Sequence, residues 1–148
     1  MFNKKLAIVG ASGAVGRVFI ELLEEMYPGT KDLFLVASKR SAGRSMFCGK
    51  QEFIIQDIEE FNFSQVEIAF FSAGAETAEK YAPIAVSKGC TVIDNSSQFR
   101  TDLDKPLIVP EVNSKDLKNF KLPGIIANPN CSTAQLVVAL KPIHDLFK

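Results

Sequence analysis

The amino-acid sequence predicts an α/β domain with a doubly wound, mostly parallel sheet and helices on both of its faces. Short, continuous apolar runs alternate along the chain with segments of helical periodicity. A glycine-rich turn joins the first apolar run to the first helical segment, and polar residues follow the ends of several runs. Continuous apolar runs are typical of strands buried on both faces, and their alternation with helices is typical of parallel sheets.

The composition is that of a single domain able to bury a sizeable core. The chain has 148 residues, of which 47% are hydrophobic and 23% charged. Its 17 basic and 17 acidic residues balance, so neither a nucleic acid nor an anionic membrane is expected as a partner. No signal-peptide pattern opens the sequence, and no apolar run is long enough to span a membrane. Three cysteines without CxxC spacing predict neither a disulfide framework nor a metal site, and they favour a cytoplasmic protein.

The first structural unit consists of a strand, a glycine-rich turn and an amphipathic helix. Residues 6–9 form the expected strand, and the helix follows directly and stops at Pro28-Gly29. The helix is expected to lay one apolar face on the sheet. That predicted face consists of Val15, Val18, Phe19, Leu22, Leu23 and Met26.

The turn between this strand and helix predicts a Rossmann-like dinucleotide site. Glycines let a pyrophosphate approach the backbone, and the helix N-terminus supplies N–H donors and positive potential. The spacing is Gly-x-x-Gly-x-x-Gly and not the commoner Gly-x-Gly-x-x-Gly, but its position favours a dinucleotide over a tight turn without a ligand. The predicted cofactor-binding residues are Gly10, Ser12, Gly13, Ala14, Val15 and Gly16.

The loop after the second strand predicts NADP over NAD as the cofactor. The strand spans residues 33–36, and the loop begins Ser38-Lys39-Arg40-Ser41. An NAD-binding domain would carry a carboxylate here for the ribose 2′-hydroxyl. A guanidinium flanked by hydroxyls instead suits a 2′-phosphate, so Ser38, Arg40 and Ser41 are predicted to bind it. The alternative, a merely solvated loop, loses weight once the glycine turn is accepted.

The middle of the chain continues the alternation of strands and helices. A hairpin or short strands are expected around Gly49-Lys50, with Cys48 in a packing role and Phe61 and Phe63 covering an edge of the core. Further strands are expected at residues 68–71, 91–93 and 107–109. The helix over residues 77–88 contains Pro83, which predicts a kink or a restart.

A strand, a turn and a helix start close the chain and present Cys131. The apolar residues 124–127 predict a buried strand, and Asn128-Pro129-Asn130 a turn. Asn130 or Ser132 can cap the helix that follows. The positive end of a helix dipole favours the thiolate, the nucleophilic form of cysteine, although a packing role is the alternative. Ser38, Ser72, Asn95 and Cys131 all follow strand ends, so they are expected to line one crevice.

Six motifs, in the same order along the chain, resemble the N-terminal portion of aspartate-semialdehyde dehydrogenases, and together they extend over essentially the whole sequence. The motif around the cysteine is the most specific of them. N-acetyl-glutamyl-phosphate reductases share the architecture but differ around the cysteine. The motifs are Gly10-Ala11-Ser12-Gly13-Ala14-Val15-Gly16, Ser38-Lys39-Arg40-Ser41-Ala42-Gly43, Phe71-Ser72-Ala73-Gly74, Asp94-Asn95-Ser96 with Phe99-Arg100, Val109-Pro110-Glu111-Val112-Asn113 and Asn128-Pro129-Asn130-Cys131-Ser132-Thr133.

The resemblance implies a thioester mechanism. A cysteine thiolate would attack aspartyl phosphate and expel phosphate, and hydride from NADPH would convert the thioester to aspartate semialdehyde, reversibly. By this analogy Cys131 is the nucleophile, Arg100 binds the substrate phosphate and Asn130 positions the substrate. Thr77 and Asn95 are expected near the nicotinamide end of the cofactor. The implied role is in aspartate-family amino-acid biosynthesis.

The sequence also departs from the family pattern. The family's acid/base histidine and its second arginine lie further along the chain, and the only histidine here is His144. It follows Cys131 by 13 residues, or roughly 20 Å in a helix that Pro142 is expected to interrupt, so it cannot serve Cys131 as a base.

Residues 1–148 are therefore expected to form an NADP-binding domain that ends in the nucleophile-bearing helix. The substrate and dimerisation domain of a homo-oligomeric full-length enzyme would be absent. Leu136, Val137, Leu140, Ile143 and Phe147 would then lack part of their cover. The alternatives are a stand-alone NADP-binding module without catalysis and a related acyl-phosphate reductase.

Overall fold

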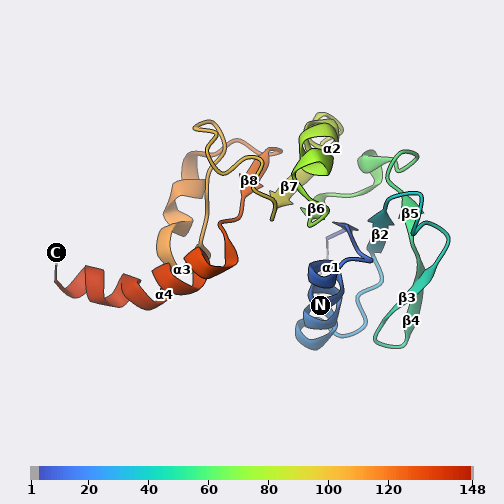
Figure 1. The fold of residues 1–148 in the computed structure, drawn as a ribbon, viewed down its shortest axis with the longest axis horizontal. Helices are drawn as coiled ribbons and strands as arrows, with labels where there is room; N and C mark the ends of the chain where they lie inside the picture. The colour runs from blue at the N-terminus through green and yellow to red at the C-terminus, as the bar shows by residue number, and fades with distance from the viewer. Residues whose placement is uncertain (1–3, 148) are drawn as a thin grey trace.

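Six short strands form one parallel sheet in the computed structural model, which describes residues 4–147 (Figure 1). The two ends of the predicted domain, residues 1–3 and 148, lie outside the described residues. Every neighbouring pair of strands in this sheet is parallel, which confirms the predicted fold class. Across the sheet the order is β5 (Gln56–Asp57), β2 (Leu33–Ala37), β1 (Leu6–Val9), β6 (Ile68–Phe71), β7 (Thr91–Asp94) and β8 (Ile125–Ala127).

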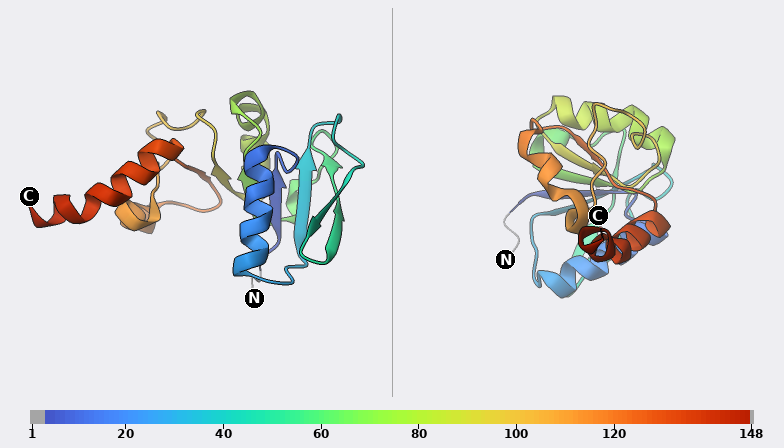
Figure 2. Two further views of the ribbon diagram at one scale, coloured as in Figure 1. Left: turned by 60° about the horizontal axis from the view of Figure 1, so that its bottom comes forward. Right: turned by 90° about the vertical axis from the view of Figure 1, so that its left-hand side faces the viewer.

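Helices α1 (Ala14–Met26) and α2 (Ala75–Ser87) cover opposite faces of this sheet (Figures 1 and 2). Successive side chains of a strand point to opposite faces, so each strand contributes to two cores. Ala7 and Val9 of β1 pack in the core on the α2 side. Leu6 and Ile8 pack in the core on the α1 side. The continuous apolar runs are thus explained by burial on both sides of the sheet.

The predicted buried face of α1 is largely wrong. Gly16, Ile20 and Leu23 are the buried residues of this helix. Four of the six predicted residues are exposed instead. The helix is rotated so that Ile20 faces the sheet, and its apolar stripe is wider than the part of the helix that contacts the sheet. Part of the remaining stripe borders an apolar hollow of about 310 Å³ next to β6 and β7. The exposed residues are Val15, Val18, Leu22 and Met26.

Neither proline inside a predicted helix breaks it. Helix α2 is continuous through Pro83, and α4 (Cys131–Leu146) is continuous through Pro142. A proline removes one backbone donor, and packing of the small residues Ala78, Ala82 and Ala85 against the sheet holds α2 together despite that loss. In α4 the Lys141–Asp145 ion pair spans the turn that contains Pro142.

The predicted strand at residues 107–109 is also absent from the described part of the chain. Leu107 makes only an isolated parallel bridge to Ala127, next to β8. Pro106 has no N–H to donate, and Pro110 begins α3 (Pro110–Asn113), so the ladder cannot extend in either direction. The Asn113 side chain accepts from Val109 N and donates to Leu107 O, which occupies groups that a strand would use.

The predicted hairpin is present as β3 (Ser45–Cys48) paired with β4 (Gln51–Ile54). Cys48 is buried, as its predicted packing role requires. Phe61 and Phe63 are buried in the core on the α2 side, where their rings pack edge to face. Two 3₁₀ helices, η1 (Phe63–Gln65) and η2 (Ser114–Asn119), lie in the connections.

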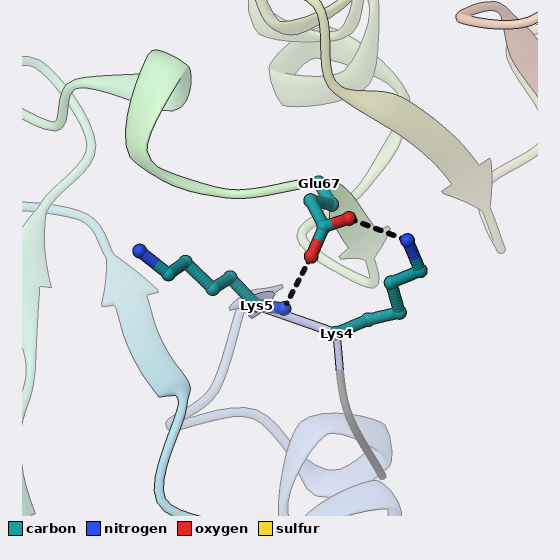
Figure 3. Close-up of polar contacts among 3 residues, drawn as sticks. All are labelled: Lys4, Lys5 and Glu67. Atoms are coloured by element: carbon teal, nitrogen blue, oxygen red, sulfur yellow. Dashed lines mark hydrogen bonds and ion pairs between the residues drawn. The ribbon is translucent and has the colours of Figure 1, made fainter.

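Glu67 joins the amino ends of β1 and β6 (Figure 3). Its carboxylate accepts from Lys4 Nζ at 2.6 Å and from the backbone N of Lys5 at 3.1 Å. These hydrogen bonds, that of Lys4 foremost, lower the pKa of Glu67. The pair is exposed and contributes little to stability, and it lies at the end of the strands opposite to the predicted ligand edge.

Helix α4 projects away from the sheet, beyond α3 (Figure 2). Of the stripe expected to lack cover, Leu136, Leu140, Ile143 and Phe147 are exposed, whereas Val137 is half-buried. The helix therefore carries its first residue, Cys131, on a segment with little packing of its own.

Candidate active site

A cleft of about 290 Å³ opens at the carboxyl ends of β1, β2 and β6. The chain runs from β1 outward to one side and then returns to β6 on the other, so this is the point at which ligands bind in open parallel sheets. Ser72, a strand-end residue that was not predicted to bind the cofactor, also borders the cleft. The predicted cofactor-binding residues that line it are Gly10, Ser12, Gly13, Ser38, Arg40 and Thr77.

Two glycines of the turn are required by close backbone contacts. Gly10 has a φ of 90°, and a Cβ there would come within 2.8 Å of the carbonyl carbon of Ser72. A Cβ on the buried Gly16 would collide with the carbonyl oxygen of Gly10 and with Ala11. The backbones of the glycine turn and of the β6 turn therefore lie against each other, at a distance that a side chain on Gly10 would not allow.

The N-terminus of α1 has the features of an anion site. Its N-cap, Gly13, makes no side-chain capping bond, and the first turn contains no acidic residue. The first amides of the helix thus have no side-chain acceptor from the cap, in a position where a phosphate would bind. Ala14 and Val15 belong to this turn and are exposed, but they do not line the cleft.

Ser41 acts on the cleft indirectly. It is buried, and Ser12 Oγ donates to its Oγ at 3.1 Å, which ties the glycine turn to the loop after β2. Ser38 and Arg40 come from the same loop and border the cleft with exposed side chains. Arg40 thus borders a cleft whose lining combines glycines and hydroxyl-bearing residues with the apolar residues Val9, Ala37, Ile58 and Ala73.

A second polar cluster joins the ends of β7 and β8. Arg100 donates from Nε to the carbonyl oxygen of Asn128 at 3.0 Å and from Nη2 to that of Asn95 at 3.1 Å. Asn128 Nδ2 in turn donates to Asn95 Oδ1 at 2.7 Å. In this arrangement Arg100, predicted to bind a substrate phosphate, holds two loops together with two of its donors.

Asp94, which ends β7, is fully buried below this cluster. Its carboxylate accepts from the backbone N of Ser96 at 3.1 Å and from Ser96 Oγ at 2.7 Å. Burial raises the pKa of Asp94, and the Ser96 bonds and the charge of Arg100 oppose that rise only in part. No role for Asp94 follows from its motif, and the structure shows that it shapes the turn bearing Asn95.

Cys131 is the first residue of α4, and its side chain is exposed. Asn130 is the N-cap, with Oδ1 accepting from Ser132 N at 2.9 Å. Of the two predicted caps, Asn130 is therefore used and Ser132 is not. The Cys131 sulfur lies 3.9 Å from the same Asn130 oxygen. His144 lies in the last turn of the helix, at the end opposite to Cys131.

The prediction of one crevice lined by four strand-end residues is wrong in part. Ser38 and Ser72 line the cleft, but Asn95 and Cys131 do not. The reason is the strand order: β7 and β8 lie two and three strands away from β1, and each step adds about 4.8 Å. Both residues still lie at the carboxyl edge of the sheet, beside the cleft and outside it.

Across residues 4–147, no cluster of three or more histidine, cysteine, aspartate or glutamate side chains could hold a metal ion. Within the same range, no helix is both long and apolar enough to cross a membrane.

Comparison with known proteins identifies the family. Residues 5–120 match the model of the semialdehyde dehydrogenase NAD-binding domain. An aspartate-semialdehyde dehydrogenase of Shewanella violacea is 54% identical over 143 residues, which are 96% of this chain and 42% of that protein. The chain thus spans less than half the length of this relative.

Solved structures agree. The structure of Vibrio cholerae aspartate semialdehyde dehydrogenase II complexed with ASA superposes with a TM-score of 0.90 at 52% identity, covering 95% of this chain and 46% of that one. The Candida albicans enzyme with NADP superposes with a TM-score of 0.81 at 32% identity, covering 97% of this chain and 47% of that one. The chain therefore belongs to the semialdehyde dehydrogenase family, whose NAD-binding domain it contains.

Proposed function

We propose that this chain is the NADP-binding, nucleophile-bearing part of an aspartate-semialdehyde dehydrogenase. The observation that carries the proposal is the pairing, at one sheet edge, of a glycine-lined cleft bordered by Arg40 with an exposed cysteine at a helix N-terminus. Such an enzyme would act in the cytoplasm, in the biosynthesis of lysine, methionine and threonine. The full-length form would be a homo-oligomer with a separate substrate domain.

The cleft fits NADP by the chemistry of its lining. The pyrophosphate would lie on the glycine turn between Gly10 and Gly16, where the first α1 amides lack a capping side chain. The 2′-phosphate would lie between Arg40 and the hydroxyls of Ser38 and Ser12. Thr77, at the start of α2, would line the path toward the nicotinamide end.

Cys131 would perform the covalent step. Its thiolate sulfur would attack the carbonyl carbon of aspartyl phosphate, and the carbon–oxygen bond to phosphate would break with the electron pair leaving on phosphate. Bound NADPH would supply the hydride that reduces the thioester. Cleavage of the carbon–sulfur bond would then release aspartate semialdehyde and regenerate the thiolate. Arg100, bonded to the turn before Cys131, and Asn130, the last residue of that turn, would contact the substrate.

The chain alone is expected to bind cofactor without turning over substrate. The phosphate that leaves would need a proton and the oxyanion formed by hydride transfer a stabilising donor, but His144 lies at the far end of α4. A stand-alone NADP-binding module would share this behaviour, and a different acyl-phosphate reductase would differ only in substrate. Reactivity of Cys131 toward aspartate semialdehyde, as opposed to its N-acetyl-glutamate counterpart, separates these readings.

Titration with NADPH and NADH, followed by nicotinamide fluorescence, tests the cofactor assignment. The unaltered chain should prefer NADPH, and Arg40→Ala should remove that preference because the 2′-phosphate loses its cationic partner. Lys39→Ala is the matched control, since Lys39 carries the same charge on the same loop but does not border the cleft. Equal binding of NADPH and NADH by the unaltered chain would overturn the NADP assignment.

A further inference from the structure

Arg17 is tied to the glycine turn by a hydrogen bond to Ser12. It is the fourth residue of α1, and its side chain is exposed. The Nε atom of Arg17 donates to the carbonyl oxygen of Ser12 at 3.1 Å. Long side chains on a helix lean toward its N-terminus, which is the direction of this bond. The guanidinium is therefore fixed beside the turn on which the pyrophosphate is proposed to lie.

Most of the hydrogen-bonding capacity of this guanidinium is unused. Glu21 follows four residues later on the same helix, a spacing at which an arginine and a glutamate can pair. Across residues 4–147, however, no carboxylate forms an ion pair with Arg17. Within that range, Nε is also the only nitrogen of the guanidinium that has an acceptor. The N–H donors of both Nη groups are thus available to a ligand.

The position of Arg17 favours an anionic ligand. The N-terminus of a helix carries positive potential, and the first turn of α1 contains no acidic residue to offset it. A guanidinium that leans toward this end adds a second positive charge to the first. An anion bound beside Ser12 would be attracted by both charges and would relieve their repulsion.

Ser12 connects Arg17 to the proposed 2′-phosphate position. Arg17 itself borders a hollow of about 290 Å³ between α1 and β3, and not the cleft. Ser12 does border the cleft, together with Arg40, and its Oγ donates to Ser41 Oγ at 3.1 Å. A phosphate on the Ser12 hydroxyl would therefore have Arg40 beside it in the cleft and Arg17 at the edge, next to the Ser12 carbonyl.

We propose that Arg17 is a specificity-determining residue, which provides a second cationic contact for the 2′-phosphate of NADP. This inference rests on the proposed NADP-binding function and deepens it. A phosphate monoester carries a charge of roughly −1.5 to −2 near neutral pH, so Arg40 alone leaves part of it uncompensated. Lys39 carries the same charge as Arg17, but no hydrogen bond within residues 4–147 holds its side chain beside Ser12.

NADPH and NADH test this role because they differ only in the 2′-phosphate. Arg17→Ala should weaken NADPH binding about tenfold, as for the loss of one charge-assisted hydrogen bond at an exposed site, and leave NADH binding unchanged. Arg44→Ala is the matched control, since Arg44 is an exposed arginine on the same side of Ser41 that borders neither the cleft nor the hollow. It should change neither affinity.

A second variant keeps the test valid if Arg17→Ala does not fold. Arg17→Gln retains a side chain with N–H donors but removes the positive charge. It should reproduce the loss of NADPH affinity and leave that of NADH unchanged.

Three results would overturn the inference. NADPH affinity unchanged in both Arg17 variants would show that the guanidinium does not contact the 2′-phosphate. Equal weakening of NADPH and NADH would indicate a contact with the pyrophosphate or a structural role. A loss of the same size in Arg44→Ala would indicate a general effect of charge.

The proposed function can fail or stand separately. If the unaltered chain preferred NADPH and Arg40→Ala alone removed that preference, NADP binding would stand and the role of Arg17 would fall. If the unaltered chain bound NADPH no better than NADH, the NADP assignment itself would fall, and the role of Arg17 with it.

Discussion

The three cysteines should differ sharply in their reactivity toward iodoacetamide. Cys131 is exposed at the start of α4, whereas Cys48 and Cys90 are buried. Burial is the main cause that raises the pKa of Cys48 to about 11, with the Glu24 carboxylate adding to it. Burial alone raises the pKa of Cys90 to about 12. Alkylation requires the thiolate, so both ionisation and access oppose reaction at the two buried sites.

The expected size of the difference follows from these values. At a pH of about 8, a pKa of about 11 leaves roughly one thiol in 1,000 ionised, and a pKa of about 12 roughly one in 10,000. An ordinary exposed thiol, with a pKa of about 8.5, is about one quarter ionised at that pH. Ionisation alone therefore predicts that alkylation at Cys48 and Cys90 is at least about 100-fold slower than at an ordinary exposed thiol. Access adds to the difference from Cys131, because only Cys131 is exposed.

Timed alkylation of the native chain, quenched and read by peptide mass spectrometry, measures all three rates at once. One label per chain should form rapidly, and Cys131→Ser should abolish that rapid phase. Raising the pH should accelerate labelling of the buried thiols about tenfold per unit until their raised pKa values are reached. In denaturant the three rates should converge. Native labelling of Cys48 or Cys90 as fast as that of Cys131 would refute the packing on which this reasoning depends.

Three further changes test the core, the turn and the buried carboxylate. Phe71→Ala should lower the free energy of unfolding in urea by about 3–5 kcal/mol, because Phe71 is fully buried and packs against the Phe63 ring; a loss below about 1 kcal/mol would contradict this. Gly16→Ala should reduce both stability and NADPH affinity, because the new Cβ meets the Gly10 carbonyl oxygen, and unchanged melting and binding would count against the close contact. The folded state raises the pKa of Asp94 above its ordinary 3.8, so the folded chain binds the Asp94 proton more tightly than the unfolded chain does. The stability that this proton contributes is lost as the pH rises through the raised pKa. Asp94→Asn has no proton to lose, so its stability relative to the unaltered chain should increase from about pH 4 toward neutrality. If urea unfolding gave parallel pH profiles for the two proteins, this reasoning would be wrong.

Several elements were predictable because their signals are local. The apolar runs of β1, β2, β6 and β7 are each only a few residues long and are each followed by turn residues. The glycine turn and the basic loop after β2 are likewise contiguous in the sequence. Their placement around one cleft follows from the rule that parallel strands present their carboxyl ends at the same edge.

The errors share a different origin. Pro83 and Pro142 each carry a local signal against a helix. Packing against the sheet overrides it in α2, and contacts within the helix override it in α4. Residues 107–109 have the apolar pattern of a strand, but the two flanking prolines and the Asn113 side chain leave room for a single bridge. The orientation of α1 depends on which part of a broad apolar stripe meets the sheet, and periodicity alone does not select it.

The sequence by itself determined the fold class, the position of the cofactor turn and the candidate nucleophile at the head of the last helix. These depend on short-range patterns: periodicity, glycine spacing and helix capping. Only the tertiary structure decided that Asn95, Arg100 and Asn128 form one hydrogen-bonded cluster and that this cluster lies beside the cleft. The side chains of Asn95 and Asn128 are 33 residues apart, and they meet because β7 and β8 are neighbours in the sheet. The order of the strands depends on the packing of the whole core. Contacts between the ends of two strands therefore depend on residues that lie far in the sequence from the motifs in contact.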